Sequence, residues 1–280
     1  MKLDFPAEKS IRDRYSVRTY QPSGLPAQIM NQLISYANGL TNPFGVPVTF
    51  LPLDIGSVDK PQKFGTYGII KGAKDYIGAV IPQQPLALEA LGYEFEQLIL
   101  YAASMGIGTC WLGGTFNREV FAQAMSVQKE DLFPAISPVG YPAEKKRLTE
   151  ALLRRGIRAD QRKPWNTLFF NSKFSSPLTQ ADAGVYALPL EMVRLGPSAS
   201  NKQPWRIVKT DGAYHFYEEK TQGYSNNFSY DIQIIDIGIA ACHFQLTALE
   251  QGLKGDFQVL PPPAVNPPEH TYYMFSWVCE

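Results

Sequence analysis

The sequence predicts an α+β fold made of two copies of one unit. Short extended segments alternate with helical ones, and two long apolar helices each stop at a glycine. The two long helices align at an offset of 146 residues, which carries Gly92 onto Gly238 and Gly106 onto Gly252. Apolar helices with glycine caps can resemble each other by composition alone. However, the repeated order of helix, extended segment, long helix and glycine favours a duplication.

The elements follow from periodicity and from residues that begin or end them. In the first copy we expect a helix at 24–38, strands at 46–53 and 76–81, a buried helix at 88–105 and a strand at 135–141. The charged stretch 143–164 predicts a surface helix and an exit loop. In the second copy we expect a helix at 183–195, a hairpin of 205–208 with 214–217, a buried helix at 232–251, a proline-rich connector at 261–268 and a strand at 272–278.

The duplication sets the expected domain organisation. The first half is placed at residues 1–160 and the second, intertwined with it, at residues 161–280. The long helices should pack together as a shared core, with antiparallel or mixed sheets flanking them. Such an internal pseudo-dimer removes the need for a partner chain, so we expect a monomer.

Composition excludes several classes of function. Lys and Arg together number 26, as do Asp and Glu, so the net charge is zero and there is no general attraction to nucleic acid or anionic membrane. No apolar run approaches the roughly 20 residues of a membrane span, and the N-terminus lacks a signal-peptide pattern. The three cysteines are scattered and have no metal-ligand spacing. We therefore expect a cytoplasmic protein without a metal, a nucleic-acid partner or a membrane partner.

Two distant motifs suggest the halves of one ligand site. Arg14, Ser16 and Arg18 place two guanidinium groups and a hydroxyl within five residues; at a helix start, positions i and i+4 would let both arginines reach one phosphate. The alternative is a solvated basic turn. Roughly 180 residues later, the run GPSASNKQPW (196–205) gathers hydroxyl and amide groups suited to the edge of a heterocycle. Its alternative is a helix cap followed by a turn.

Two further features belong to the same hypothesis. Gly113 and Gly114 leave the backbone bare, so amide groups there can approach a planar ligand; a flexible loop is an equal alternative. Arg162, in the segment that joins the halves, is the best further candidate for a phosphate contact. The three histidines have no triad or metal spacing, and no phosphate-loop, GxSxG or GxGxxG motif is present.

The two copies have not kept the same residues. Opposite PSASNKQPW the first half has LTNPFGVPV (40–48), and opposite RYSVR the second half has LFFNSKF (168–174), which contains no arginine. Each half keeps what the other lacks. We therefore expect one complete site and one that has lost its ligand-binding residues.

These pieces together resemble the FMN-dependent nitroreductase family, in particular its members in which two family units sit in one chain. The likeness rests on RYSVRTY (14–20), GYEFEQLILYAASMGIGTCWLGG (92–114), VGYPAEKKR (139–147) with RKPW (162–165), and GPSASNKQPWRIV (196–208).

The resemblance implies FMN as cofactor and NADH or NADPH as electron donor. By position, the FMN phosphate and ribityl end would be held by Arg14, Ser16 and Arg162, and Arg18 would lie near the pyrimidine edge of the flavin. The ring and ribityl chain would be contacted from the other unit by Pro197, Ser198, Ala199, Asn201 and Gln203. The loop whose backbone amide points at flavin N5 would contain Trp111, Gly113 and Gly114. The position before Gly114 is often acidic in the family but is glycine here, which changes the expected surroundings of N5.

The resemblance also implies the reaction. The expected activity is ping-pong reduction of a small electron-poor acceptor (a nitroaromatic, a quinone or similar) by NAD(P)H through one composite flavin site. No side-chain acid or base is needed, in keeping with the absence of a histidine candidate. A non-catalytic flavin- or ligand-binding protein on a degenerate fold of this type is the alternative. Another chemistry on the same scaffold, such as dehalogenation or flavin fragmentation, also remains open.

Overall fold

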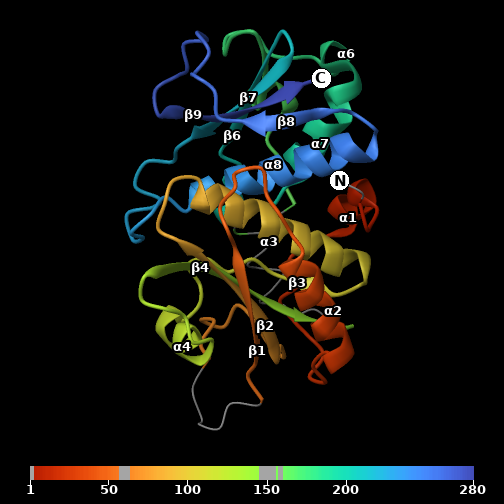
Figure 1. Cartoon of the computed structure of the whole chain (residues 1–280), viewed down its shortest axis with the longest axis vertical. Coiled ribbons are helices and arrows are strands. Elements are labelled where there is room, and N and C mark those ends of the chain that lie inside the picture. The colour runs from red at the N-terminus through yellow and green to blue at the C-terminus, as the bar shows by residue number, and fades with distance from the viewer. Residues whose placement is uncertain (1–2, 57–63, 145–155, 157–159) are drawn as a thin grey trace.

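Two long helices, α3 (Ala87–Ser104) and α8 (Gln233–Glu250), cross at the centre of the molecule (Figure 1). The computed structural model describes residues 3–56, 64–144, 156 and 160–280. The duplicated glycines let the two helices approach closely: a Cβ on Gly92 would lie 2.1 Å from the Ile235 carbonyl oxygen, and one on Gly238 2.1 Å from that of Glu89. The expected packing of the long helices as a shared core is confirmed.

One sheet lies on each side of this helix pair (Figure 1). The first has the order β1-β2-β4-β3, with strands Thr49–Asp54, Asp75–Pro82, Asp131–Gly140 and Gly108–Thr109. The second has the order β5-β6-β7-β9-β8, with strands Phe169–Asn171, Trp205–Thr210, Ala213–Glu219, Thr271–Cys279 and Gly255–Gln258. Apart from the parallel pair β5 and β6, neighbouring strands are antiparallel. If β5 is left out, the strand order of the second sheet (β6-β7-β9-β8) matches that of the first (β1-β2-β4-β3). This match confirms an α+β fold made of two copies of one unit.

The shorter helices flank these layers. They are α1 (Ala7–Asp13), α2 (Ala27–Asn38), α4 (Arg118–Ala124), α6 (Gln180–Ala183) and α7 (Ala187–Leu195). The helix expected at 183–195 is interrupted at Gly184, whose φ of 59° is left-handed, and α7 follows it. Gly106 and Gly252 have φ of 73° and 72°, as expected of helix-ending glycines.

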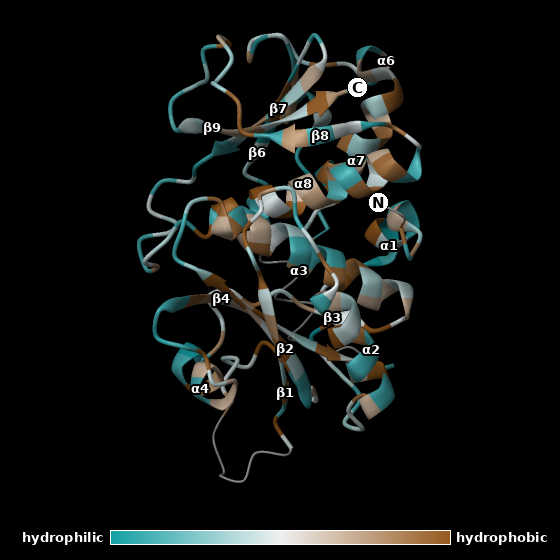
Figure 2. Cartoon of the chain, viewed as in Figure 1, coloured by the Kyte–Doolittle hydropathy of each residue, from teal (hydrophilic) through white to brown (hydrophobic). Residues whose placement is uncertain are grey.

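Each central helix contributes to both cores. From α8, Ile235 and Ile239 pack with α2, α3 and the first sheet, while Tyr93 and Leu100 of α3 pack with α7 and the second sheet. This explains why both helices are apolar around most of their circumference (Figure 2). The halves are therefore joined through a continuous hydrophobic interior.

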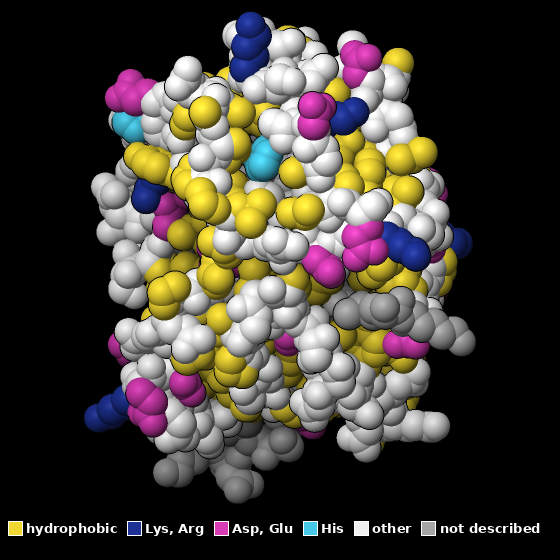
Figure 3. Space-filling view, turned by 45° about the horizontal axis from the view of Figure 1, so that its top comes forward, with side chains coloured by type: hydrophobic (Ala, Val, Ile, Leu, Met, Phe, Trp, Pro, Cys, Tyr) yellow, Lys and Arg dark blue, Asp and Glu magenta, His cyan; other side chains and the backbone are white. Residues whose placement is uncertain are grey.

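Some expectations are not tested by the structure. The surface helix expected within 143–164 falls largely outside the described residues. The boundary between residues 160 and 161 lies between β4, which ends at Gly140, and β5, which begins at Phe169, and it stays a prediction. Among the helices that are described, none has the length and apolar character needed to cross a bilayer. On the face shown in Figure 3, side chains of both charges are scattered among apolar ones.

Candidate active site at the junction of the halves

A cavity of about 560 Å³ lies where the two halves meet, a size typical of small-molecule pockets. The first half contributes Arg14, Ser16, Arg18, Trp111, Gly113 and Gly114 to its wall, and the segment after it contributes Arg162. The second half contributes Pro197, Ser198, Ala199 and Asn201. The structure thus gathers around one cavity all the residues predicted for the site except Gln203.

The segment from Arg14 to Arg18 is extended, so the expectation that it begins a helix is wrong. Helix α1 ends at Asp13, Arg14 has extended backbone angles, and Ser16 forms a parallel bridge with Thr109 of β3. The reason is pairing with the first sheet: the Val17 amide donates to the Thr109 carbonyl at 2.8 Å. In an extended chain alternate residues share a face. The three polar residues therefore still line one wall, while Val17 is buried in the core between them.

The loop after β3 leaves two backbone amides available. Within the described part of the chain, neither the Gly113 nor the Gly114 amide donates a hydrogen bond. A side chain at either position would have to displace a neighbour: a Cβ on Gly113 would lie 2.7 Å from Ile232 Cδ1, and one on Gly114 3.0 Å from Phe228 Cζ. The two glycines therefore let side chains of the second half pack closely over this loop.

Arg118, which the sequence analysis missed, fixes this loop. Its guanidinium donates to the carbonyls of Gly113 (2.6 Å), Phe133 (2.8 Å) and Pro134 (3.1 Å), and to the hydroxyl of Tyr230 (3.2 Å). An arginine in the first turn of a helix is unfavourable for the helix dipole. This unfavourable position was the sign in the sequence that the Arg118 side chain has a role other than stabilising the helix.

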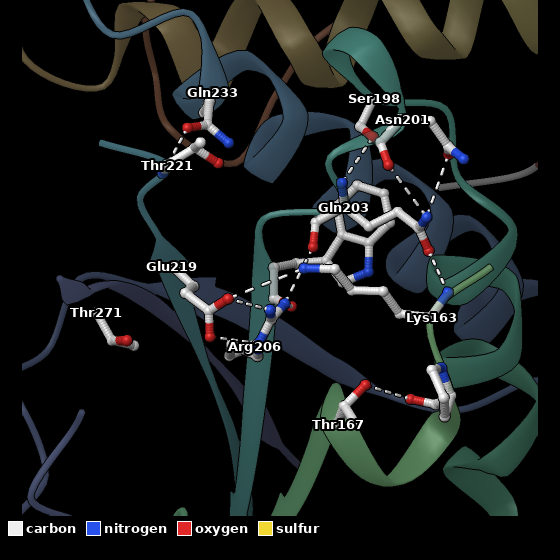
Figure 4. A network of polar contacts seen from close by, with 12 residues as sticks. Lys163, Thr167, Ser198, Asn201, Gln203, Arg206, Glu219, Thr221, Gln233 and Thr271 are labelled. Atoms are coloured by element: carbon white, nitrogen blue, oxygen red, sulfur yellow. Dashed lines mark hydrogen bonds and ion pairs between the residues drawn. The ribbon is translucent and has the colours of Figure 1, made fainter. Parts of the chain in front are cut away.

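The turn between α7 and β6 is held by its own polar side chains (Figure 4). Ser198 Oγ accepts from the Gln203 amide at 2.8 Å, and Gln203 Oε1 accepts from the Lys163 amide at 2.8 Å. Gln203 Nε2 donates to the side-chain oxygen of Asn201 at 3.2 Å. Gln203 is buried behind the cavity wall, so it shapes the turn rather than facing a ligand.

The same turn contains unusual backbone angles. Ser200, Asn201 and Gln203 have φ of 47°, 56° and 50°, a region that costs a non-glycine residue free energy. Such angles persist only where surrounding bonds enforce them. Here the bonds come from Gln203, from Tyr224, whose hydroxyl donates to Ser200 Oγ at 2.8 Å, and from a buried aspartate on α8.

That aspartate, Asp236, also escaped the sequence analysis. It lines the cavity, and its two carboxyl oxygens lie 3.0 and 3.1 Å from the Ala199 amide that donates to them. Burial raises its pKa well above the ordinary value, which the hydrogen bond from Ala199 only partly opposes. An acidic residue in the first turn of an apolar helix was a weak signal, because it reads equally well as a helix-dipole partner.

Arg162 is anchored by backbone carbonyls. Its Nη2 donates to the Leu195 carbonyl at the end of α7 at 3.1 Å, and its Nη1 donates to the Gln161 carbonyl at 3.0 Å. Nη1 also lies 3.4 Å from Asn201 Oδ1, which ties Arg162 to the turn. A cation at the C-terminal end of a helix is electrostatically favoured.

An apolar wall completes the cavity. It comes from α8 and the connection between β7 and α8, and consists of Tyr224, Phe228, Ile232, Ile235 and Ile239. The connection runs from Lys220 to Ile232, whereas that between β2 and α3 runs only from Gln83 to Leu86. Sequence reasoning assigned no role to this longer connection, because its aromatic residues carry no motif.

The corresponding place in the other half is filled by aromatic side chains. Phe44 occupies the position that corresponds to Asn201 in the alignment of LTNPFGVPV with PSASNKQPW. Its ring centroid lies 4.9 Å from that of Phe275, 6.3 Å from that of Phe257 and 6.3 Å from that of Tyr93. Phe257 lies 146 residues after Trp111, so it is the counterpart of a cavity residue. This packing supports the expectation that the second pseudo-site is lost.

The described histidines lie away from the cavity. His215 bonds to Thr210 and Ser276 within the second sheet, and His243 is buried between the central helices. No group of His, Cys, Asp or Glu side chains in the described ranges is arranged to hold a metal ion.

Comparison with known families gives one match that covers most of the chain. The family described as "Putative TM nitroreductase" matches residues 7–248. No curated protein sequence matches the chain.

Comparison with solved structures shows the same fold over the whole length. A protein described as a putative nitroreductase from Thermotoga maritima MSB8 is 20% identical, with a TM-score of 0.63 over 100% of this chain and 96% of that one. A nitroreductase with bound FMN from Bacteroides fragilis is 20% identical, with a TM-score of 0.41 over 51% of this chain and 91% of that one. An FMN-dependent nitroreductase from Clostridium difficile R20291 is 17% identical, with a TM-score of 0.40 over 49% of this chain and 88% of that one.

Proposed function

Because this chain belongs to the nitroreductase family and is an oxidoreductase of that type, we propose that it is an FMN-dependent NAD(P)H oxidoreductase with one composite flavin site. Its acceptors would be small electron-poor molecules such as nitroaromatics or quinones. The observation that carries the proposal is the junction cavity, where cationic residues of the first half face the amide-rich turn of the second.

The residues around the cavity fit FMN at both of its ends. A phosphate needs cationic and hydroxyl donors, which Arg14 and Ser16 supply from the first half and Arg162 from the segment after it. Arg14 Nε is buried and lies 3.7 Å from the Glu96 carboxylate without a hydrogen bond among the described residues, so the terminal nitrogens are the donors that a phosphate would meet. A planar ring needs flat apolar walls and a bare backbone, which Trp111 and the two glycines supply.

FMN, when bound, supplies the redox chemistry, and the protein supplies binding, orientation and electrostatics. Arg18 is buried, and its Nη1 donates to the Ser16 carbonyl at 3.3 Å, so its positive charge is fixed in a region of low dielectric. There it would favour negative charge on the neighbouring pyrimidine edge. The Gly113 and Gly114 amides would donate to the ring, in the orientation that Arg118 imposes through the Gly113 carbonyl.

The apolar wall would exclude water and receive donor and acceptor in turn. Tyr224, Phe228 and Ile232 line the cavity from the second half, with Ile232 directly before α8. One space that serves both substrates leads to ping-pong kinetics. No described histidine faces the cavity, in keeping with a reaction that needs no side-chain acid or base.

Two measurements test the proposal, first the flavin content of the protein and then the reduction of the bound flavin. Purified protein should show visible flavin absorbance or gain it on addition of FMN, and NADH or NADPH should bleach it in stopped flow. Initial rates with a quinone should give the parallel reciprocal plots of ping-pong turnover. Protein that does not bind FMN contradicts the proposal as a whole. Bound FMN that neither nucleotide reduces would instead identify a flavin-binding protein without this activity.

A further inference from the structure

A carboxylate behind the cavity wall connects two parts of the site. Glu96 of α3 is fully buried. Its Oε2 accepts from the indole Nε1 of Trp111 at 2.6 Å, and its Oε1 lies 3.7 Å from Arg14 Nε. Both partners line the cavity, and the Arg14 side chain is itself only 7% exposed. One buried negative charge therefore faces both the cationic wall and the loop after β3.

The second half holds this carboxylate from the opposite side. His243 of α8, also fully buried, places Nε2 2.9 Å from Glu96 Oε1 and Nδ1 2.8 Å from the Met192 carbonyl oxygen of α7. A carbonyl oxygen only accepts, so Nδ1 donates to Met192, while Nε2 contacts the Glu96 carboxylate on the other side of the ring. Through this chain of contacts the core of the second half fixes where the Glu96 carboxylate sits.

Comparison of the two copies shows that the pair of Glu96 and His243 occurs only on the side of the junction cavity. The offset of 146 residues carries Glu96 onto Cys242 and Gln97 onto His243. On the side filled by Phe44, Gln97 Nε2 donates to the Tyr36 hydroxyl at 3.1 Å, in place of the imidazole bond to the carbonyl of Met192. A carboxylate and imidazole that served only to join the central helices would be equally useful on both sides. At these paired positions the carboxylate is present only on the side of the open cavity.

We propose that Glu96 is a positioning residue for the phosphate end of the site. Its carboxylate holds the Nε side of the Arg14 guanidinium, which leaves the two terminal nitrogens for an anion. His243 holds the carboxylate in turn. This inference rests on the proposed function, because the FMN phosphate is the anion that Arg14 would meet.

Glu96→Gln tests the role of the charge with little change in shape. Glutamine can still accept from Trp111, but it removes the anion and places an amide N–H2 beside His243 and Arg14. Apoprotein would be titrated with FMN and with riboflavin, which lacks the phosphate. FMN affinity should fall by about tenfold or more and riboflavin affinity by less than about threefold, because a charge-assisted contact is lost only at the phosphate.

Glu94→Gln is a matched control on the same helix. Glu94 is also buried, but its carboxylate accepts from Asn42 at 2.6 Å on the side filled by Phe44. Both flavin affinities should match those of the unmodified protein. Circular dichroism and thermal melting would check the fold of each variant. If Glu96→Gln does not fold, Glu96→Asp keeps the charge but draws it back from Arg14, and the preference for FMN over riboflavin should again fall.

A double-mutant comparison identifies the residue through which Glu96 acts. In an Arg14→Ala background, Glu96→Gln should cause no further loss of FMN affinity. Additive losses would overturn the inference, as would equal losses for FMN and riboflavin or an unchanged preference between them. Failure of the unmodified protein to bind FMN would instead contradict the proposed function.

Discussion

At the scale of single residues, the candidate site consists of ligand-facing groups and of groups that only support them. Arg14 and Asn201 line the cavity, whereas Gln203 lies behind it and ties Asn201 to the Lys163 amide. The sequence analysis placed all three in direct contact with a ligand. The structure gives Gln203 an indirect role, because its side-chain donors and acceptor are all directed to the protein.

We predict that Arg14→Ala and Asn201→Ala each weaken FMN binding by about 10- to 100-fold, the effect of losing a hydrogen bond that involves a charged group. Gln203→Ala should weaken binding by a similar factor and should also lower the melting temperature, because the Lys163 amide loses its acceptor. Fluorescence titration with FMN measures the affinities, and thermal melting measures stability.

Asn42→Ala and Phe44→Leu are the matched changes in the other half. Phe44 packs in an aromatic cluster, so its replacement should lower stability, but both variants should retain FMN affinity within about threefold once folded. A comparable loss of affinity in these variants would mean that the two halves bind ligand alike and that the single-site interpretation is wrong.

At the scale of elements, periodicity and end signals predicted most of the fold. The buried helices, their glycine ends and the hairpin of β6 and β7 all follow from local pattern. The segment from Arg14 to Arg18 was placed wrongly at a helix start, because its extended shape comes from pairing with β3, a contact that no local pattern encodes.

The supporting residues of the site were missed for the same reason. Arg118 and Glu96 each contact a residue of the other half, Tyr230 and His243, and Asp236 accepts from Ala199, which lies 37 residues earlier, so the local pattern does not show these partners. Their own surroundings in the sequence are ordinary. Charged residues on an otherwise apolar helix were the visible sign, but a solvated helix face produces the same sign.

The contact between α3 and α8 leads to a prediction about stability. Gly92→Ala and Gly238→Ala each introduce a methyl group that would lie 2.1 Å from a carbonyl oxygen of the other helix, so the helices must separate. We expect the free energy of unfolding to fall by about 2 kcal/mol or more, measured by denaturant unfolding. Gly106→Ala is the control: nothing lies within 4 Å, and only its φ of 73° imposes a cost of about 1 kcal/mol. Equal effects at all three positions would contradict the close-contact interpretation.

At the scale of the whole molecule, buried carboxyl groups make stability depend on pH. Burial raises the pKa of Glu89 and of Glu218 to about 7, and the nearby Asp231 adds to the effect at Glu218. Both groups bind protons in the folded state at pH values where the unfolded chain has already lost them. Their contribution to stability is therefore complete below the ordinary pKa of about 4.5 and declines as the pH rises through 7.

We predict that the free energy of unfolding decreases between pH 5 and pH 8 by about 1–3 kcal/mol for each of these two groups. The double variant Glu89→Gln, Glu218→Gln, which mimics the protonated pair, should lessen the slope over this range but not abolish it, because burial also raises the pKa values of Glu94 and Asp236. Urea unfolding at a series of pH values measures both. A profile that rises with pH in the unmodified protein, or a slope that the double variant leaves unchanged, would exclude these carboxyls as its cause.

The composite cavity also makes ligand binding a property of the whole chain. Because both halves line it, FMN should stabilise them together, by about 2.7 kcal/mol when free FMN is 100 times its dissociation constant. Calorimetry should show a single transition that moves to higher temperature with added FMN. Two transitions, of which FMN moves only one, would indicate that the ligand is held by one half alone.

The contact of Gly92 with α8 also affects the candidate site, because it helps to set the distance between Glu96 and His243. Gly92 lies one helical turn before Glu96, so the separation of the two helices at the glycine also fixes how near Glu96 can come to His243. A methyl group at position 92 would separate the helices and lengthen the 2.9 Å contact between Glu96 Oε1 and His243 Nε2. Variants with alanine at position 92 that still fold should therefore release flavin more readily than the unmodified protein. The site therefore depends on the absence of a side chain at position 92, although Gly92 does not line the cavity.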